Sequence, residues 1–205
     1  MNINVRELEN QLADVDAAAR GTRVEIDALN ELGWALVPVD HRRAADLFDR
    51  ALDLSAPLSY ELGVARATFG RAYFDFFKAD YGSALNKAQE CAPILRELGT
   101  PEDRSNVLLL EGMVHWSLGD FELALDSLHR ACEISQACNH AYGVGWNLTS
   151  LGSIYAELGD FDKSVDLQKR AVELFREVGS VVGEGRALSG LGMPLHLADV
   201  GLAVG

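Results

Sequence analysis

The chain has 205 residues, of which 48% are hydrophobic and 24% are charged. This composition is typical of a folded protein and argues against a disordered segment. Its 31 acidic residues outnumber the 18 basic ones and give a net charge of −13, which disfavours binding to nucleic-acid phosphates or an anionic membrane surface.

The first predicted element is a helix near residues 4–19. Its apolar residues are spaced by three and four positions, as on one face of a helix: Val5, Leu8, Leu12 and Val15. The opening sequence MNINVRELENQL lacks a basic start followed by an apolar run, so it predicts neither a secretory signal nor a membrane span. We therefore expect a cytoplasmic protein whose first helix caps a stack of further helices.

An internal repeat with a period of forty residues dominates the rest of the sequence. Aspartates recur at that spacing at Asp40, Asp80, Asp120 and Asp160, each just ahead of a helical apolar pattern. A carboxylate at this position can accept a backbone N–H of the first turn and interacts favourably with the positive end of the helix dipole. These four residues are therefore predicted to be helix N-caps.

A second helical segment precedes each aspartate and carries an internal glycine, at Gly33, Gly70, Gly112, Gly152 and, one repeat later, Gly192. Glycine inside a helix costs about 1 kcal/mol relative to alanine, so its recurrence indicates close approach of a partner helix. The pattern predicts one solenoid over residues 1–205, built from helix hairpins at 22–55, 60–97, 102–137 and 142–177, with an incomplete fifth repeat at 182–205.

The last of these segments departs from the pattern. The next aspartate is due at position 200, but the sequence reads ADVGLAVG over Ala198 to Gly205. A natural terminal repeat usually carries a polar outer face, and this stretch is apolar. Between an irregular cap and a fragment cut inside a repeat, we expect the fragment.

Residues that could support chemistry form no catalytic or metal-binding pattern. The spacing of Cys132, Cys138 and His140 matches none of the compact structural zinc motifs, and the three cysteines are expected to be buried or unpaired thiols. No nucleophilic side chain stands at a position of the repeat that would bring it together with a general base and an acid. The sequence therefore predicts neither an enzyme, nor a cofactor, nor a metal site.

The spacing of glycines, aromatics and alanines resembles the tetratricopeptide repeat, a helix-turn-helix unit. The segment LGSIYAELGDFDKSVDLQKRAVEL carries the pattern at Leu151, Gly152, Tyr155, Gly159, Phe161 and Ala171, and the preceding unit carries it at Gly112, Gly119, Phe121, Ala124 and Ala131. The forty-residue period is similar to that of the longer repeats of kinesin light chains, spindle-orientation adaptors and bacterial signalling proteins.

The resemblance implies an all-α fold, a right-handed α-solenoid that binds a peptide or partner domain on its concave surface. In this family the first helix of each hairpin lines that surface. Counted from the glycines, the predicted binding residues are Asn30, Trp34, Arg71, Phe74, Asn106, Leu109, Met113, Trp116, Trp146, Thr149, Ser153 and Arg186. Aromatic side chains beside polar groups suit such a surface, although aromatics at helical spacing also occur in cores.

The function expected from the sequence is therefore a non-catalytic protein–protein interaction module. Two alternatives stay open at this point. The chain could be the sensory segment of a larger bacterial signalling protein, or it could self-assemble into homo-oligomers through its C-terminal edge, since each repeat buries its apolar face only against a neighbour.

Overall fold

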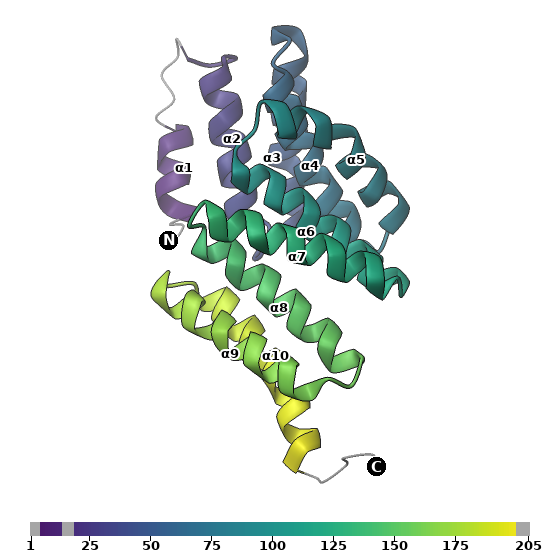
Figure 1. Cartoon of the computed structure of the whole chain (residues 1–205). Helices are drawn as coiled ribbons and strands as arrows, with labels where there is room; N and C mark the ends of the chain where they lie inside the picture. The colour runs from purple at the N-terminus through teal and green to yellow at the C-terminus, as the bar shows by residue number, and fades with distance from the viewer. Residues whose placement is uncertain (1–4, 14–18, 200–205) are drawn as a thin grey trace. The chain divides into compact units, whose positions relative to one another are not determined.

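The structure is a computed structural model that describes residues 5–13 and 19–199, and side chains as far as residue 192. All regular structure within these residues is helical (Figure 1). The helices are α1 (Val5–Ala13), α2 (Arg23–Leu36), α3 (His41–Ser55), the short 3-10 helix η1 (Ala56–Leu58), α4 (Glu61–Phe77), α5 (Tyr81–Glu97), α6 (Pro101–Leu118), α7 (Phe121–Ala137), α8 (Ala141–Glu157), α9 (Phe161–Glu177) and α10 (Val181–Asp199).

Consecutive helices pack together as hairpins, which confirms the expected all-α solenoid fold. The helices α2, α4, α6, α8 and α10 are called first helices, and α3, α5, α7 and α9 second helices. α1 ends at Ala13, whereas the sequence pattern extended this helix to residue 19; Val15 of its apolar stripe lies outside the described residues.

The chain divides into two compact units, which are described separately. The N-terminal unit comprises Ile3–Leu110 and the C-terminal unit comprises Glu111–Gly205. The boundary falls inside α6, so each unit receives one part of that helix. A single solenoid over residues 1–205 stays a prediction.

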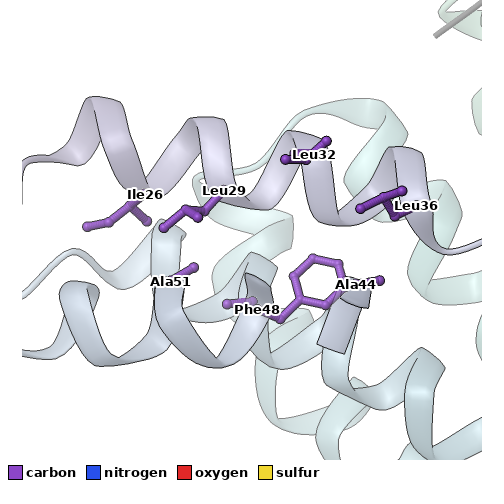
Figure 2. Close-up of a cluster of buried hydrophobic side chains, with 8 residues drawn as sticks. Ile26, Leu29, Leu32, Leu36, Ala44, Phe48 and Ala51 are labelled. Carbon is purple, nitrogen blue, oxygen red and sulfur yellow. The ribbon is translucent and has the colours of Figure 1, made fainter. Parts of the chain in front are cut away.

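The core of the N-terminal unit forms where α2 faces α3 (Figure 2). One stripe of α2 supplies Ile26, Leu29, Leu32 and Leu36, and the facing stripe of α3 supplies Ala44, Phe48 and Ala51, all nearly or fully buried. The small alanines let the two backbones approach, and the ring of Phe48 fills the space between them.

The glycines of the first helices were predicted to mark the close approach of a partner helix, because glycine is unfavourable inside a helix. The structure shows such close contacts. A Cβ atom added to Gly33 would lie 2.6 Å from Cε1 of Phe48, and one on Gly112 would lie 2.7 Å from Cγ of Leu128. Gly70 likewise faces Phe48, and Gly152 faces Gln168. Gly192 differs, because a Cβ there would meet nothing within 4 Å in the part of the chain that the structure describes.

Three of the four predicted N-caps form. The Oδ1 atoms of Asp40, Asp80 and Asp160 accept the backbone N–H three residues on, at 3.0, 3.2 and 3.2 Å. Asp120 also occupies an N-cap position, but its side chain makes no capping hydrogen bond, and its Oδ2 lies 3.7 Å from Nδ1 of His115. The expectation of a side-chain cap was therefore wrong at Asp120.

Candidate functional site: the first-helix surface

In the N-terminal unit, the predicted binding residues are largely engaged in packing. The indole of Trp34 is half-buried, with its ring centroid 5.3 Å from that of Phe69 and 5.1 Å from that of Tyr73. Asn30 is buried, and its Nδ2 donates to the carbonyl oxygen of Gly63 at 3.4 Å. Trp34 and Asn30 thus join α2 to α4.

On α4, Arg71 and Phe74 form a pair. The guanidinium of Arg71 lies 4.8 Å from the ring centroid of Phe74, in the geometry of a cation–π contact. Nε of Arg71 also lies 3.2 Å from Oδ1 of Asp49 on the neighbouring α3. Both predicted residues are half-buried, and the ion pair with Asp49 orients the Arg71 side chain.

The first part of α6 completes the predicted set of the N-terminal unit. Asn106 is half-buried, whereas Leu109 is 6% exposed and packs between helices.

In the C-terminal unit, Trp116 connects two first helices. Its indole Nε1 donates a hydrogen bond to Oε2 of Glu157 at 3.0 Å, which links the end of α6 to the end of α8. The ring is half-buried and the carboxylate is exposed, so both reach the surface. Met113, one turn before Trp116 on the same helix, is also half-buried.

Near the start of α8, Trp146 packs against the second helix α9. Its ring centroid lies 5.6 Å from that of Phe175 on α9 and 6.2 Å from that of Tyr142. Phe175 is fully buried and Trp146 is half-buried, so the indole packs on the core and is in part accessible to solvent.

The polar residues of α8 form a short hydrogen-bonded chain. Oγ1 of the buried Thr149 donates to the carbonyl oxygen of Gly145 at 2.9 Å, and Oγ of Ser153 donates to the carbonyl oxygen of Thr149 at 3.0 Å. Nε2 of Gln168, a fully buried residue of α9, donates to the same Thr149 oxygen at 3.1 Å. Ser153 is half-buried and is the member of this chain that reaches the surface.

The remaining predicted residue, Arg186 on α10, is exposed. The predicted residues of the C-terminal unit that reach the surface are therefore Met113, Trp116, Trp146, Ser153 and Arg186, which come from three successive first helices.

Sequence reasoning missed Glu157. The count from Gly152 stopped at Ala156, which is 7% exposed, and no signal distinguished the next residue from the other surface carboxylates. On α4 the count from Gly70 selected Arg71 and Phe74, whereas the positions forty residues before Met113 and Trp116 are the buried Tyr73 and the half-buried Phe76.

No group of histidine, cysteine and carboxylate side chains that could hold a metal is present among the described residues. The cysteines there form no disulfide: Cys91 and Cys132 are buried and Cys138 is half-buried. Burial raises the pKa of the Cys132 thiol, which favours its unreactive protonated form. None of the helices in the described part of the chain is long and apolar enough to cross a membrane.

The comparisons with known proteins agree with this arrangement. Residues 103–177, which cover α7, α8, α9 and most of α6, match the family model of the tetratricopeptide repeat. This part of the chain is therefore similar to the tetratricopeptide repeat. Such repeats generally mediate protein–protein interaction and are generally non-catalytic. No curated protein sequence matches this chain.

Two solved structures share the fold. One is a Signal Transduction ATPase with Numerous Domains (STAND) protein with a tetratricopeptide repeat sensor from Pyrococcus horikoshii; the TM-score is 0.61 and the identity 16%, over 91% of this chain and 28% of that one. The other is BtubC (BKLC) from P. vanneervenii, with a TM-score of 0.61 and an identity of 15%, over 96% of this chain and 87% of that one. The chain thus spans little more than a quarter of the STAND protein.

Proposed function

We propose that the chain is a non-catalytic protein-interaction module that binds a peptide or a partner domain on the first-helix surface of its C-terminal unit. The observation that carries this proposal is the hydrogen bond between Trp116 and Glu157. It orients a large aromatic ring beside a carboxylate at a surface to which two neighbouring helices contribute.

The chemistry of this surface suits recognition of a polypeptide. Half-buried aromatic and thioether side chains at Met113, Trp116 and Trp146 provide apolar contact area without the entropy cost of ordering a loop. The Ser153 hydroxyl, the Glu157 carboxylate and the Arg186 guanidinium provide polar groups of both signs. Such a surface would anchor apolar side chains and orient them through hydrogen bonds and charge.

A direct test starts from peptides selected on the intact chain from a random displayed library. Their affinity is then measured for the wild type and for Trp116→Ala. Because buried aromatic anchors contribute most of the energy of an interface, we expect at least a tenfold weaker affinity, equivalent to about 1.4 kcal/mol.

The matched control is Leu123→Ala, which removes a side chain that is 54% exposed on α7, away from the first helices. The control should bind the peptides like the wild type. Unchanged affinity in Trp116→Ala, with unchanged helicity by circular dichroism, would contradict the proposed surface.

A second candidate function is that of a sensory segment in a larger signalling protein. It is favoured by the fold shared with a STAND protein that has a tetratricopeptide repeat sensor. Partner binding would then control an attached output domain. Sequencing the source gene past the codon for Gly205 tests this idea, because an open frame leading into a nucleotide-binding domain is expected, and an immediate stop codon would argue against it.

A further inference from the structure

The exposed carboxylate of Glu157 forms no ion pair within the part of the chain that the structure describes. All 18 arginines and lysines of the sequence fall within these described residues. Glu157 instead accepts a hydrogen bond from the neutral indole of Trp116. This hydrogen bond orients the negative charge of the carboxylate but does not neutralise it.

The ring of Trp116 offers a second favourable contact for a cation. Among the ring–ring and cation–π contacts of the described residues, none involves Trp116. The indole is half-buried, so part of it is accessible to solvent. An indole face is electron-rich and attracts a cation more strongly than the ring of tyrosine or phenylalanine does. Trp116 and Glu157 thus present two groups that attract positive charge, side by side.

Both residues also lie at the C-terminal ends of helices. Trp116 stands two residues before the end of α6, and Glu157 is the last residue of α8. The C-terminal end of a helix carries a partial negative charge, which favours a cation nearby. Lys163, the closest lysine along the sequence, is engaged elsewhere, because its Nζ lies 3.8 Å from the ring centroid of Tyr155. The electrostatics at Trp116 and Glu157 therefore favour a cation that these helices do not supply.

The N-terminal unit contains a similar arrangement in which the cation is present. The hydroxyl of Tyr60, the N-cap residue of α4, donates a hydrogen bond to Oδ1 of Asp27 on α2 at 2.9 Å. The guanidinium carbon of Arg23 lies 4.9 Å from the ring centroid of Tyr60. An aromatic residue and a carboxylate here join two successive first helices, as Trp116 and Glu157 do, and an arginine lies over the ring.

Arg71 shows the same preference in a second cluster of the N-terminal unit. Its guanidinium lies 4.8 Å from the ring centroid of Phe74, and its Nε lies 3.2 Å from Oδ1 of Asp49. One arginine thus contacts a ring and a carboxylate at the same time. Trp116 and Glu157 provide a ring and a carboxylate of this kind, and no arginine of the described residues contacts them.

We propose that Trp116 and Glu157 together bind an arginine or lysine side chain of the polypeptide partner. The cation lies over the indole and pairs with the Glu157 carboxylate, while its aliphatic stem follows the apolar surface of the ring. Arginine is favoured, because its planar guanidinium stacks on an aromatic ring and pairs with a carboxylate. The net charge of −13 also favours the approach of a basic partner. This inference rests on the proposed function of the same surface and adds the class of residue that is recognised.

The probes for this inference are peptides selected on the intact chain from a random displayed library. We expect arginine and lysine to be enriched in the selected peptides relative to the unselected library. In a synthetic copy of one such peptide, the basic residue is then replaced by methionine, which keeps the aliphatic length and removes the charge. The affinity of this peptide, measured by fluorescence anisotropy, should fall about fivefold or more.

The variant Glu157→Gln separates the charge from the geometry of the site. Its amide oxygen can still accept the indole N–H of Trp116, so the ring keeps its orientation while the negative charge is lost. The variant should bind the basic peptide about fivefold more weakly than the wild type does, and the methionine peptide equally well. The matched control is Glu133→Gln, which removes an exposed carboxylate from α7, a second helix, and should bind both peptides like the wild type.

Three results would overturn the inference, and they differ in what they say of the proposed function. If Trp116→Ala weakens peptide binding but the selected peptides are not enriched in basic residues, or Glu157→Gln binds them like the wild type, this inference alone is wrong. If Trp116→Ala binds them like the wild type, the proposed function at this surface is wrong and the inference fails with it. A molar mass in light scattering that rises with concentration, and that Glu157→Gln reduces to the monomer, would identify a second copy as the source of the cation.

Discussion

The indole N–H of Trp116 and the carboxylate of Glu157 are joined across α6 and α8 by a hydrogen bond of 3.0 Å. The two residues are 41 positions apart, so the contact exists only because successive first helices lie side by side within the C-terminal unit. It holds the indole at the surface in one orientation, which is the arrangement that an anchor for a partner requires.

Removal of this contact should affect recognition more than stability. Glu157 is exposed, and a solvent-accessible hydrogen bond contributes about 0.5 to 1.5 kcal/mol at most, because water replaces the lost partner. We expect Glu157→Ala to lower the free energy of unfolding by less than about 1 kcal/mol in urea denaturation. A loss above about 2 kcal/mol would show that the pair is part of the core instead.

The contact between Gly70 and Phe48 predicts a steric effect in the N-terminal unit. A methyl group at Gly70 would clash with a fully buried aromatic ring, so Gly70→Ala should destabilise the fold by about 1 to 3 kcal/mol. The control is Gly82→Ala, where the added methyl meets nothing and should stabilise α5 by up to about 1 kcal/mol. Thermal unfolding shows whether each variant is more or less stable than the wild type. Equal changes in melting temperature for the two variants would contradict the packing role of Gly70.

Phe175 is a central packing residue in the core of the C-terminal unit. It is fully buried, and its ring centroid lies 6.0 Å from that of Tyr142 and 5.6 Å from that of Trp146. Two glycines on the adjoining helices leave room for its ring, Gly145 on α8 and Gly183 on α10. Phe175→Ala should cost about 3 to 5 kcal/mol. Tryptophan emission should shift to longer wavelength as Trp146 gains water; an unshifted spectrum would contradict the contact.

The aspartates at the starts of the second helices should differ in their contribution to stability. Asp160 accepts the backbone N–H of Lys163, so Asp160→Ala should lose about 0.5 to 2 kcal/mol. Asp120 makes no capping hydrogen bond, so Asp120→Ala should lose less. Urea denaturation of the two variants compares them directly, and a larger loss in Asp120→Ala would contradict the geometry.

Asp75 gives the chain a pH dependence. Burial by itself would raise the pKa of this carboxyl, but hydrogen bonds from Lys87 at 2.6 Å and Ser83 at 2.7 Å, with the lysine charge, outweigh burial and lower the pKa below its usual value. A depressed folded-state pKa stabilises the fold above the unfolded pKa of about 3.9, and this contribution is lost as the pH falls through the folded pKa.

The variant Asp75→Asn should therefore be less stable than the wild type at pH 7, by about 1.5 to 3 kcal/mol, the usual range for a hydrogen bond to a charged group. The difference should shrink as the pH falls below about 4, because the wild-type carboxyl then also becomes neutral. Denaturation at several pH values measures the difference. A gap that stays constant down to pH 2 would contradict the role of the ionised Asp75.

The sequence by itself determined the helices and their order. Aspartates at a forty-residue spacing, followed by helical apolar patterns, predict where the second helices begin, and the glycines of the first helices predict where partners pack closely. These are local signals, since capping and helix propensity depend on residues within one or two turns. The resemblance to tetratricopeptide repeats followed from the same spacing.

The tertiary structure alone decided which partners the predicted binding residues contact. Trp34 and Trp116 were equivalent candidates in the sequence, yet Trp34 packs against Phe69 and Tyr73, whereas Trp116 extends to Glu157. The same holds for the glycines, since Gly152 is covered by Gln168, whereas a Cβ on Gly192 would meet nothing within 4 Å among the described residues. These contacts come from side chains 16 to 41 residues away in the sequence, and no local pattern specifies how those side chains fill the space between helices.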